Sequence, residues 1–309
     1  MVYPPRYPLI FNPKARSQRG RRAMKFIIDN ATRFALYATR DAMEAQNLAR
    51  EFAEKGEKVI VAAGGDGTMN AIVRGLADTE TALGMLPTGT MNVFARELGI
   101  PFEELSDSLR VIDDAMIEEV DLFRANEHPF LQMAGVGFDA QVIHETSWES
   151  KKAFGPLAYL FSAVKVLGAK PPEMTVTTDD GRVYKGVCVL AGNGALYGGQ
   201  IRLFTKASNT DGHLDVLIYR ESGYRLIRDS LEGVVRGDTE KFGESVDYIQ
   251  AKEITVTCDR KVPVEVDGDF AEITDKVAFR ASANKLRVIG TGEHPESDFG
   301  KMLRSLIGV

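Results

Sequence analysis

The chain has 309 residues, 44% of them hydrophobic and 27% charged, and its 44 Asp and Glu outnumber its 38 Lys and Arg for a net charge of −6. This is the composition of a globular protein long enough for two domains, and its acidic balance argues against nucleic acid as the main partner. No apolar run reaches the roughly 18 residues that span a bilayer, no signal-peptide core follows Met1, and the only cysteines are Cys188 and Cys258, so we expect a cytoplasmic protein with free thiols.

The first third of the chain alternates short apolar segments with helical patterns. The segments that predict strands are Tyr7–Phe11, Phe34–Ala38, Val59–Ala63 and Ala82–Leu86. The patterns that predict helices cover residues 41–55, 68–76, 93–98 and about 100–115. Alternation of this kind is typical of a doubly wound, mostly parallel sheet.

A basic cluster, Lys14–Lys25, follows the first predicted strand and the dipeptide Asn12-Pro13. The cluster fits a solvated helix face. It also fits a surface that attracts phosphate or anionic lipid. The residues alone leave both interpretations open.

The third strand runs into a glycine turn with Gly64, Gly65 and Gly67, and a helix is predicted from Thr68. A strand, a glycine turn and a helix start together favour an anion site, because the backbone can approach the anion closely and free N–H groups face it. Asp66 would repel phosphate unless a divalent cation lies between them, or unless its carboxylate accepts a proton or hydrogen bond. An ordinary turn with an Asp cap is the alternative.

The fourth strand ends in a similar turn, Pro87-Thr88-Gly89-Thr90. Turns after successive parallel strands lie side by side at the carboxyl edge of the sheet, where open α/β sheets bind ligands. Neither turn has the Gly-Lys-Ser/Thr ending of a Walker A loop.

From Ile117 to about Phe279 short strands dominate, which predicts a β-rich domain, either a sandwich or an open barrel. The expected strands are Glu119–Arg124, Phe130–Ala134, Thr175–Thr178, Val183–Ala191, Leu214–Tyr219, Ile254–Cys258, Val262–Val266 and Lys276–Ala281. Asp179-Asp180-Gly181 and Asp211-Gly212 are expected as hairpin turns. A last strand is expected over Leu286–Ile289.

Two stretches of this region have alternative interpretations. An apolar helix predicted from Pro156 to Gly168 is either an ordinary core helix or a wall of an acyl-chain cleft. The segment Gly135–Ala140 matches the dinucleotide fingerprint G-x-G-x-x-A. It lies among strands with no second parallel strand, so we do not expect a nicotinamide site there.

Two acidic stretches could carry chemistry. The segment Ser208–Asp215 could hold a hard cation through Asp211 and backbone carbonyls, or it could be only a turn. Asp267-Gly268-Asp269 ends a predicted strand, where a carboxylate could take the proton of a hydroxyl that attacks a phosphate.

The motif Gly64–Thr68 followed by Pro87–Asn92 resembles the diacylglycerol kinase catalytic-domain family, which includes bacterial lipid kinases and sphingosine kinases. The first motif alone is also found in NAD kinases. The resemblance implies a doubly wound, NAD kinase-like nucleotide-binding domain over residues 1–116 and a β-sandwich lipid-substrate domain over residues 117–289. It further implies that the chain returns to the first domain, with the strand Leu286–Ile289 and the tail, residues 290–309, packing back on it.

The resemblance implies an ATP-dependent kinase that phosphorylates a lipid hydroxyl, with Mg²⁺ between the phosphates and Asp66. The catalytic residues would be Asp66 and Asp269, the latter as proton acceptor, and Asp121 would join the carboxylate network of Asp66. The ATP-binding positions would be Asn12, Pro13, Thr39, Gly64, Gly65, Asp66, Gly67, Thr68, Met69, Asn70, Gly89 and Thr90. A structural magnesium would be held by Ser208, Asp211 and His213.

The chain departs from the family pattern at four places. Ala71 stands where the family has Glu, Val93 where it often has Asp, and Asp269 where it has Glu. Ala15-Arg16 also replaces the usual Ser-Gly. These changes affect the carboxylate network and the reach of the proton acceptor.

Two alternatives to a lipid kinase remain at this stage. An NAD kinase shares the first glycine motif, but Asn92-Val93 does not supply the Asn-Glu pair that binds the nicotinamide ribose in that family. The other alternative is a catalytically silent nucleotide-binding regulatory protein.

For the lipid kinase the partners would be ATP and a lipid. We expect transient contact with the inner membrane surface and a possible homodimer. The identity of the lipid stays open.

Overall fold

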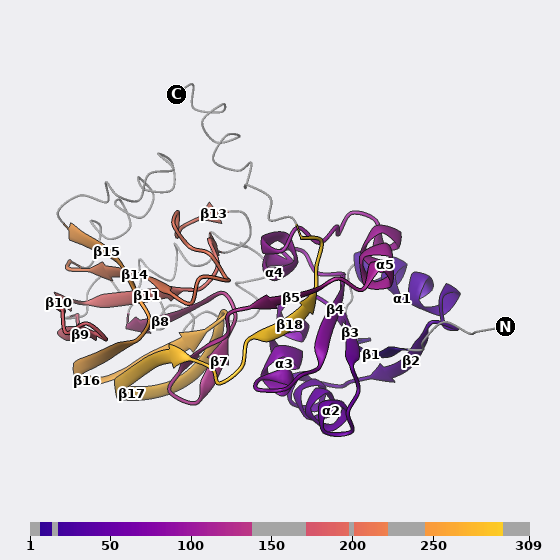
Figure 1. Cartoon of the computed structure of the whole chain (residues 1–309). Coiled ribbons are helices and arrows are strands. Elements are labelled where there is room, and N and C mark those ends of the chain that lie inside the picture. The colour runs from indigo at the N-terminus through magenta and orange to yellow at the C-terminus, as the bar shows by residue number, and fades with distance from the viewer. Residues whose placement is uncertain (1–6, 14–17, 138–170, 198–200, 222–244, 293–309) are drawn as a thin grey trace. The chain divides into compact units, whose positions relative to one another are not determined.

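A computed structural model of the chain describes residues 7–13, 18–137, 171–197, 201–221 and 245–292. The chain forms two compact units (Figure 1). Among the described residues, the first unit runs to Leu122 and resumes at Ser282, and the second runs from Phe123 to Ala281. Residues 117–122 therefore belong to the first unit, although they were expected in the second domain, and the strand at 286–289 belongs to the first unit as well.

The first unit is built on a six-stranded sheet with the order β2-β1-β3-β4-β18-β5. Its strands are β1 (Tyr7–Phe11), β2 (Phe34–Ala38), β3 (Val59–Gly64), β4 (Ala82–Pro87), β5 (Ile117–Val120) and β18 (Leu286–Ile289). Every neighbouring pair is parallel except β18 and β5. The predicted α/β unit with a mostly parallel sheet is thus confirmed.

Five helices connect these strands among the described residues: α1 (Gln18–Asp29), α2 (Ala42–Glu54), α3 (Asp66–Leu76), α4 (Val93–Glu97) and α5 (Leu105–Asp114). Ile27 of α1 and Ile112 of α5 join the same buried cluster as the strands, and Figure 1 shows α2 and α3 on the opposite face. The last helix begins later than expected, because residues 100–104 are not helical.

Strand β18 brings a distant part of the chain into the first sheet. It lies between β4 and β5, with Leu286 and Val288 fully or almost fully buried. The approach to this strand is fixed by Ser282 N, which donates to Leu122 O at 2.7 Å. After it, Thr291 Oγ1 donates to Leu98 O at 3.3 Å. The predicted return of the chain to the first sheet is therefore observed up to residue 292.

The second unit is an antiparallel β sandwich. Its main strand order is β15-β14-β11-β8-β16-β17-β6-β7, and the hairpin of β9 and β10 pairs with β16. The strands are β6 (Phe123–Ala125), β7 (His128–Phe130), β8 (Met133–Gly137), β9 (Met174–Thr178), β10 (Val183–Gly186), β11 (Cys188–Gly192), β14 (Leu214–Tyr219), β15 (Val246–Ala251), β16 (Ile254–Val266) and β17 (Asp269–Ala281). A short separate pair is formed by β12 (Leu196–Tyr197) and β13 (Ile201–Arg202).

Several predicted strands of this unit needed correction. Ile254–Cys258 and Val262–Val266 form one strand, β16, with a register shift between Thr257 and Val262. The predicted strand Val183–Ala191 is split into β10 and β11. The turn at Asp211-Gly212 leads from β13 to β14, which pair with different partners, so it is not a hairpin turn. The turn at Asp179–Gly181 does join the paired strands β9 and β10.

Some expectations fall on residues outside the described ranges. These are the start of the basic cluster (residues 14–17), the end of the fingerprint-like segment (138–140), the apolar helix (156–168) and the tail from residue 293. Within the ranges that are described, no helix has both the length and the apolar character needed to cross a membrane.

Candidate active site

The two glycine turns of the first unit touch each other through their backbones. Thr88 N donates to Gly64 O at 2.8 Å. A Cβ atom built on Gly89 would lie 2.5 Å from Gly65 Cα, and one built on Gly65 would lie 3.0 Å from Gly89 Cα. Real Cβ atoms essentially never approach backbone as closely as 2.5 Å, so position 89 requires glycine, and at position 65 a side chain would force the second turn to shift. The sequence prediction that the turns lie side by side holds in the structure.

Helix α3 starts inside the first of these turns. Gly65 caps the helix with an extended conformation, and its carbonyl accepts hydrogen bonds from Thr68 N and Met69 N. A Cβ atom built on Gly67 would meet no atom within 4 Å. The start of α3 therefore faces open space, as an anion site at a helix N-terminus requires.

The Asp66 carboxylate connects the first turn to helix α4. Its Oδ2 accepts from Asn92 N at 3.0 Å and its Oδ1 accepts from Val93 N at 2.6 Å. Burial raises the pKa of Asp66 above its ordinary value, and the backbone N–H groups of Val93 and Asn92 and the charge of Arg96 oppose that rise. Hydrogen bonding, one of the two roles expected for this carboxylate, is thus observed. No local sequence pattern indicates that the donors, Asn92 N and Val93 N, come from the second turn and the helix start after it.

The other expected ATP residues of this unit divide into two groups. Asn12 and Pro13 follow β1, and Thr39 follows β2, so both places lie at the carboxyl edge that carries the glycine turns. Thr39 is buried, and its Oγ1 donates to Phe11 O at 3.2 Å. The side chains of Met69 and Asn70 are buried within the unit, at 3% and 6% exposure. Both side chains therefore lie inside the unit and not on its surface.

Asp121 follows β5 and is buried, and Lys285 Nζ lies 2.8 Å from its Oδ1. Among the described residues, no three His, Cys, Asp or Glu side chains group together as a metal site. A magnesium ion at Asp66 would therefore depend on one carboxylate together with substrate phosphates. That arrangement is common for Mg²⁺, and each Asp66 oxygen keeps a lone pair beyond its hydrogen bond.

In the second unit, the turn between β16 and β17 fixes the position of Asp269. Asp267 and Gly268 both have positive φ, 50° and 82°, which is the geometry of a tight two-residue hairpin turn. Gly268 N donates to Glu265 Oε2 at 2.9 Å, and Asp269 is the exposed first residue of β17. A short rigid turn thus presents the Asp269 carboxylate to solvent.

Asp267 has a structural role that the sequence did not reveal. Its carboxylate accepts from Leu131 N at 2.9 Å, Gln132 N at 2.8 Å and Met133 N at 3.1 Å. On the other side of this turn, Gln132 O accepts from Asn193 N at 2.8 Å. The acidic hairpin, the turn before β8 and the glycine-rich loop after β11 therefore form one hydrogen-bonded corner, which we call the acidic corner. Its members lie more than 60 positions apart, so no local pattern predicts it.

The expected structural metal segment forms a compact turn. Ser208 Oγ and Thr210 Oγ1 are 3.1 Å apart, and Asp211 Oδ1 accepts from His213 N at 2.9 Å. The ring Nδ1 of His213 lies 2.9 Å from Asp211 O. Asp211 and Ser208 could supply oxygen ligands to a hard cation, with one carboxylate among them.

A pair formed by the buried Asp215 and the half-buried Tyr248 holds this segment against the sheet. Lys206 N donates to Tyr248 Oη at 3.0 Å, and Tyr248 Oη donates to Asp215 Oδ1 at 2.5 Å. Burial raises the pKa of both Asp215 and Tyr248. This contact fixes the path of the segment between β13 and β14.

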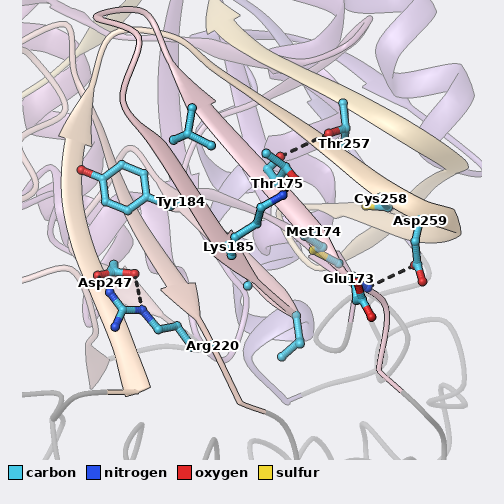
Figure 2. Close-up of a pocket in the computed structure, with 13 residues that line it drawn as sticks. Glu173, Met174, Thr175, Tyr184, Lys185, Arg220, Asp247, Thr257, Cys258 and Asp259 are labelled. Atoms are coloured by element: carbon cyan, nitrogen blue, oxygen red, sulfur yellow. Dashed lines mark hydrogen bonds and ion pairs between the residues drawn. The ribbon is translucent and has the colours of Figure 1, made fainter.

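A separate pocket of roughly 770 Å³ lies in the second unit, lined by the start of β9, by β10, by Arg220 after β14, by Asp247 of β15 and by residues 257–259 within β16 (Figure 2). Arg220 forms an ion pair with Asp247 across one side, and Glu173 N donates to Asp259 Oδ1 at 3.1 Å on another. The pocket borders the start of β11 at Val187, whereas Asn193 follows the end of that strand. The pocket is therefore at the opposite strand ends from the acidic corner.

Solved structures place this fold among kinases. A diacylglycerol kinase from Bacillus anthracis str. Sterne has a TM-score of 0.75 at 25% sequence identity, covering 94% of this chain and 99% of that chain. An NAD kinase from Archaeoglobus fulgidus, in complex with ATP, has a TM-score of 0.50 at 12% identity, which shows a likeness of fold alone.

Sequence comparisons then identify the family. Residues 6–125 match the model of the diacylglycerol kinase catalytic domain, and residues 132–290 match the YegS C-terminal NAD kinase beta sandwich-like domain. A protein of Chromohalobacter salexigens named "Probable lipid kinase YegS-like" is 32% identical over 84% of this chain and 86% of its own length. A diacylglycerol kinase of Bacillus subtilis is 29% identical over 76% of this chain and 78% of its own length. The chain belongs to the diacylglycerol kinase catalytic-domain family of lipid kinases.

Proposed function

We propose that this protein is an ATP-dependent lipid kinase that transfers the γ-phosphate to a lipid hydroxyl. The observation that carries the proposal is the contact between the two glycine turns, where Gly65 and Gly89 meet with no room for a side chain. Such a bare backbone surface beside the start of α3 suits a polyphosphate. Relatives in the same family are named diacylglycerol kinase and lipid kinase, which supports a lipid as the acceptor.

In this proposal the first unit binds ATP and the second unit binds the lipid. The phosphates would lie on the two glycine turns, with Asn12 and Thr39 at the neighbouring strand ends. Asp66 would hold Mg²⁺, which neutralises charge on the phosphates during transfer. Asp121, which forms an ion pair with Lys285, would join the carboxylate network of Asp66.

Asp269 would accept the proton of the attacking hydroxyl. The hydroxyl oxygen forms a bond to the γ-phosphorus, the bond from that phosphorus to the β–γ bridging oxygen breaks, and ADP leaves. Asp269 is suited to this role because it is exposed and projects from a short hairpin turn fixed by Glu265 and Asp267. The kinase would reach its lipid substrate by transient contact with the inner membrane surface. It would act as a monomer or as a homodimer.

The test is the transfer of labelled γ-phosphate from ATP and Mg²⁺ to a panel of lipids in mixed micelles. We expect one lipid class to be labelled by the wild type, and the Asp66→Asn and Asp269→Asn variants to be slower by at least about 100-fold. Asp275→Asn is the matched control for Asp269, because Asp275 is an exposed carboxylate of the same strand. Asp41→Asn is the control for Asp66, because Asp41 also caps a helix.

Two results would reject the proposal. Phosphate transfer to NAD and to no lipid would identify an NAD kinase. ATP binding without transfer to any acceptor would favour a silent nucleotide-binding protein, and Ala71, Val93 and Asp269 would then be the residues that explain the loss.

A further inference from the structure

Strand β2 forms an edge of the first sheet that lacks the usual protection against pairing. The sheet order ends with β2, and among the described strands it pairs with β1 alone. Edge strands are normally blunted by charged residues, by proline or by bulges, because an open edge pairs readily with other chains. β2 has none of these, since its sequence is Phe-Ala-Leu-Tyr-Ala and its register with β1 is uninterrupted. The strand at the opposite edge, β5, carries two glutamates in four residues, so the lack of protection is specific to β2.

The backbone of β2 presents hydrogen-bonding groups at this edge. Thr39 N, directly after the strand, donates to Phe11 O of β1 at 2.9 Å. Successive residues of a strand direct their N–H and C=O groups alternately to one side and to the other, so the odd-numbered residues of β2 face β1. Leu36 and Ala38 therefore direct their N–H and C=O groups to the open edge.

Apolar side chains are exposed on both faces of the sheet at this edge. Leu36 is 38% exposed, and Tyr37, which points to the opposite face, is 37% exposed. Ile28 near the end of α1 and Met43 in the first turn of α2 are more exposed still, and these are the two helices that the chain joins to β2. Exposed apolar residues that gather in one place are typical of interaction surfaces. The helices α1 and α2 thus leave room for a further strand beside β2.

We propose that β2 pairs with β2 of a second copy of this chain, antiparallel about a two-fold axis at Leu36. Antiparallel pairing of identical strands is self-complementary, as the interface of a closed symmetric dimer must be. Each large side chain in this register lies opposite a small one: Phe34 and Tyr37 oppose Ala38 and Ala35 of the other copy, and Leu36 opposes Leu36. None of these residues is charged, so no like charges meet, and the two six-stranded sheets would join into one.

Sedimentation equilibrium of the full chain over a range of concentrations tests whether this dimer forms. We expect the wild type to reach twice the mass of one chain. Leu36→Lys would place two ammonium groups face to face on the axis, and like charges directly opposite destabilise a strand pair, so the mass should fall to that of one chain. Val183→Lys is the matched control, because Val183 is an exposed apolar residue of β10, which pairs with β9 alone among the described strands of the second unit. This control should stay dimeric.

A pair of cysteine variants tests the register and does not depend on how well Leu36→Lys folds. Opposite residues of a hydrogen-bonded antiparallel pair have Cα atoms about 5.5 Å apart, which is within the range of a disulfide. Leu36→Cys should therefore give a disulfide-linked dimer under mild oxidation. Ala38→Cys should not, because its counterpart in the other copy lies four residues along the strand, roughly 14 Å away. The wild type measures any linkage through the free thiols Cys188 and Cys258.

Three results would overturn the inference. A wild type with the mass of one chain at every concentration would reject a second copy as the partner of this edge. A dimer that persists in Leu36→Lys would place the interface on another surface. Equal linkage of Leu36→Cys and Ala38→Cys would contradict the register about Leu36. Because none of these measurements uses phosphate transfer, the outcome is independent of the proposed kinase activity.

Discussion

At the scale of single residues, the roles of the acids depend on partners far away in the chain. Asp66 looks like a metal ligand in its local motif, and the structure shows that its two oxygens also hold the start of α4. Asp267 looks like a turn residue, and it binds three N–H groups of the segment 131–133. The motif predicts where such carboxylates lie, but their hydrogen-bond donors come from segments 26 or more positions away and cannot be predicted from it.

The buried position of Asp66 predicts an unusual dependence of stability on pH. Burial raises its folded pKa above the unfolded value, so its contribution to stability is present at low pH and is lost as pH rises through the folded pKa. Asp66→Asn removes this titration. We therefore expect the wild type to lose free energy of unfolding relative to Asp66→Asn as pH rises from about 4.

Urea unfolding between pH 3.5 and 7 would measure this difference. The Asp41→Asn variant makes the same Asp to Asn change at an exposed helix cap, so it measures how much free energy of unfolding such an exchange costs where the carboxylate is not buried. If the difference in free energy of unfolding between wild type and Asp66→Asn stays constant over this pH range, the folded pKa of Asp66 is not raised above its ordinary value.

At the scale of elements, sequence patterns work best where one face or both faces of a segment are buried. The largely buried strands Tyr7–Phe11, Leu214–Tyr219 and Leu286–Ile289 have the predicted bounds. Phe34–Ala38 also has the predicted bounds, because all its residues are apolar, although only Phe34 is buried. By contrast, Val246–Ala251 was not predicted as a strand, because only two of its residues are buried and its apolar alternation is weak. The long strand β16 was predicted as two pieces, because exposed charged residues interrupt it at its register shift.

The glycine turns give a matched pair of variants. In Gly89→Ala the new methyl group would meet the backbone of Gly65, so we expect a loss of about 2–4 kcal/mol in free energy of unfolding and loss of ATP binding. In Gly67→Ala the methyl group meets no atom of the protein, and alanine favours a helix over glycine. Stability should then stay the same or rise slightly.

Two measurements on both variants test where the phosphates bind and whether the two turns touch: calorimetry of ATP binding and thermal unfolding. If the phosphates lie at the start of α3, Gly67→Ala should fold normally and bind ATP more weakly. Normal ATP affinity in Gly67→Ala would place the phosphates elsewhere, and normal stability in Gly89→Ala would contradict the close contact of the two turns.

The hairpin anchor Asp267 provides the other prediction at this scale. Asp267→Ala leaves three backbone N–H groups without their acceptor, and we expect it to cost about 2–4 kcal/mol in free energy of unfolding. Hydrogen exchange should show lost protection at Leu131, Gln132 and Met133. Asp259→Ala, which removes a single acceptor for Glu173 N, is the control and should cost less.

At the scale of the whole molecule, the chain builds its first unit from two distant segments. The sheet is complete only when β18, residues 286–289, lies between β4 and β5. The alternation of strands and helices predicts the parallel part of this sheet. Only the family resemblance implied that Leu286–Ile289 and the tail return to the first domain, because nothing local to Leu286–Ile289 specifies its partner strands.

This topology predicts that a substitution near the end of the chain destabilises its beginning. Val288 is fully buried, and its neighbours in the sheet are Leu83 of β4 and Glu118 of β5. Val288→Ala should cost about 2–3 kcal/mol in free energy of unfolding through the cavity it leaves.

Because units with separate cores open separately, hydrogen-exchange protection should fall in β3, β4 and β5 and stay unchanged in β9, β14 and β16. Val277→Ala, at a fully buried position of the second unit, should give the reverse pattern. Equal loss of protection throughout the chain in both variants would show that the two units unfold as one cooperative body.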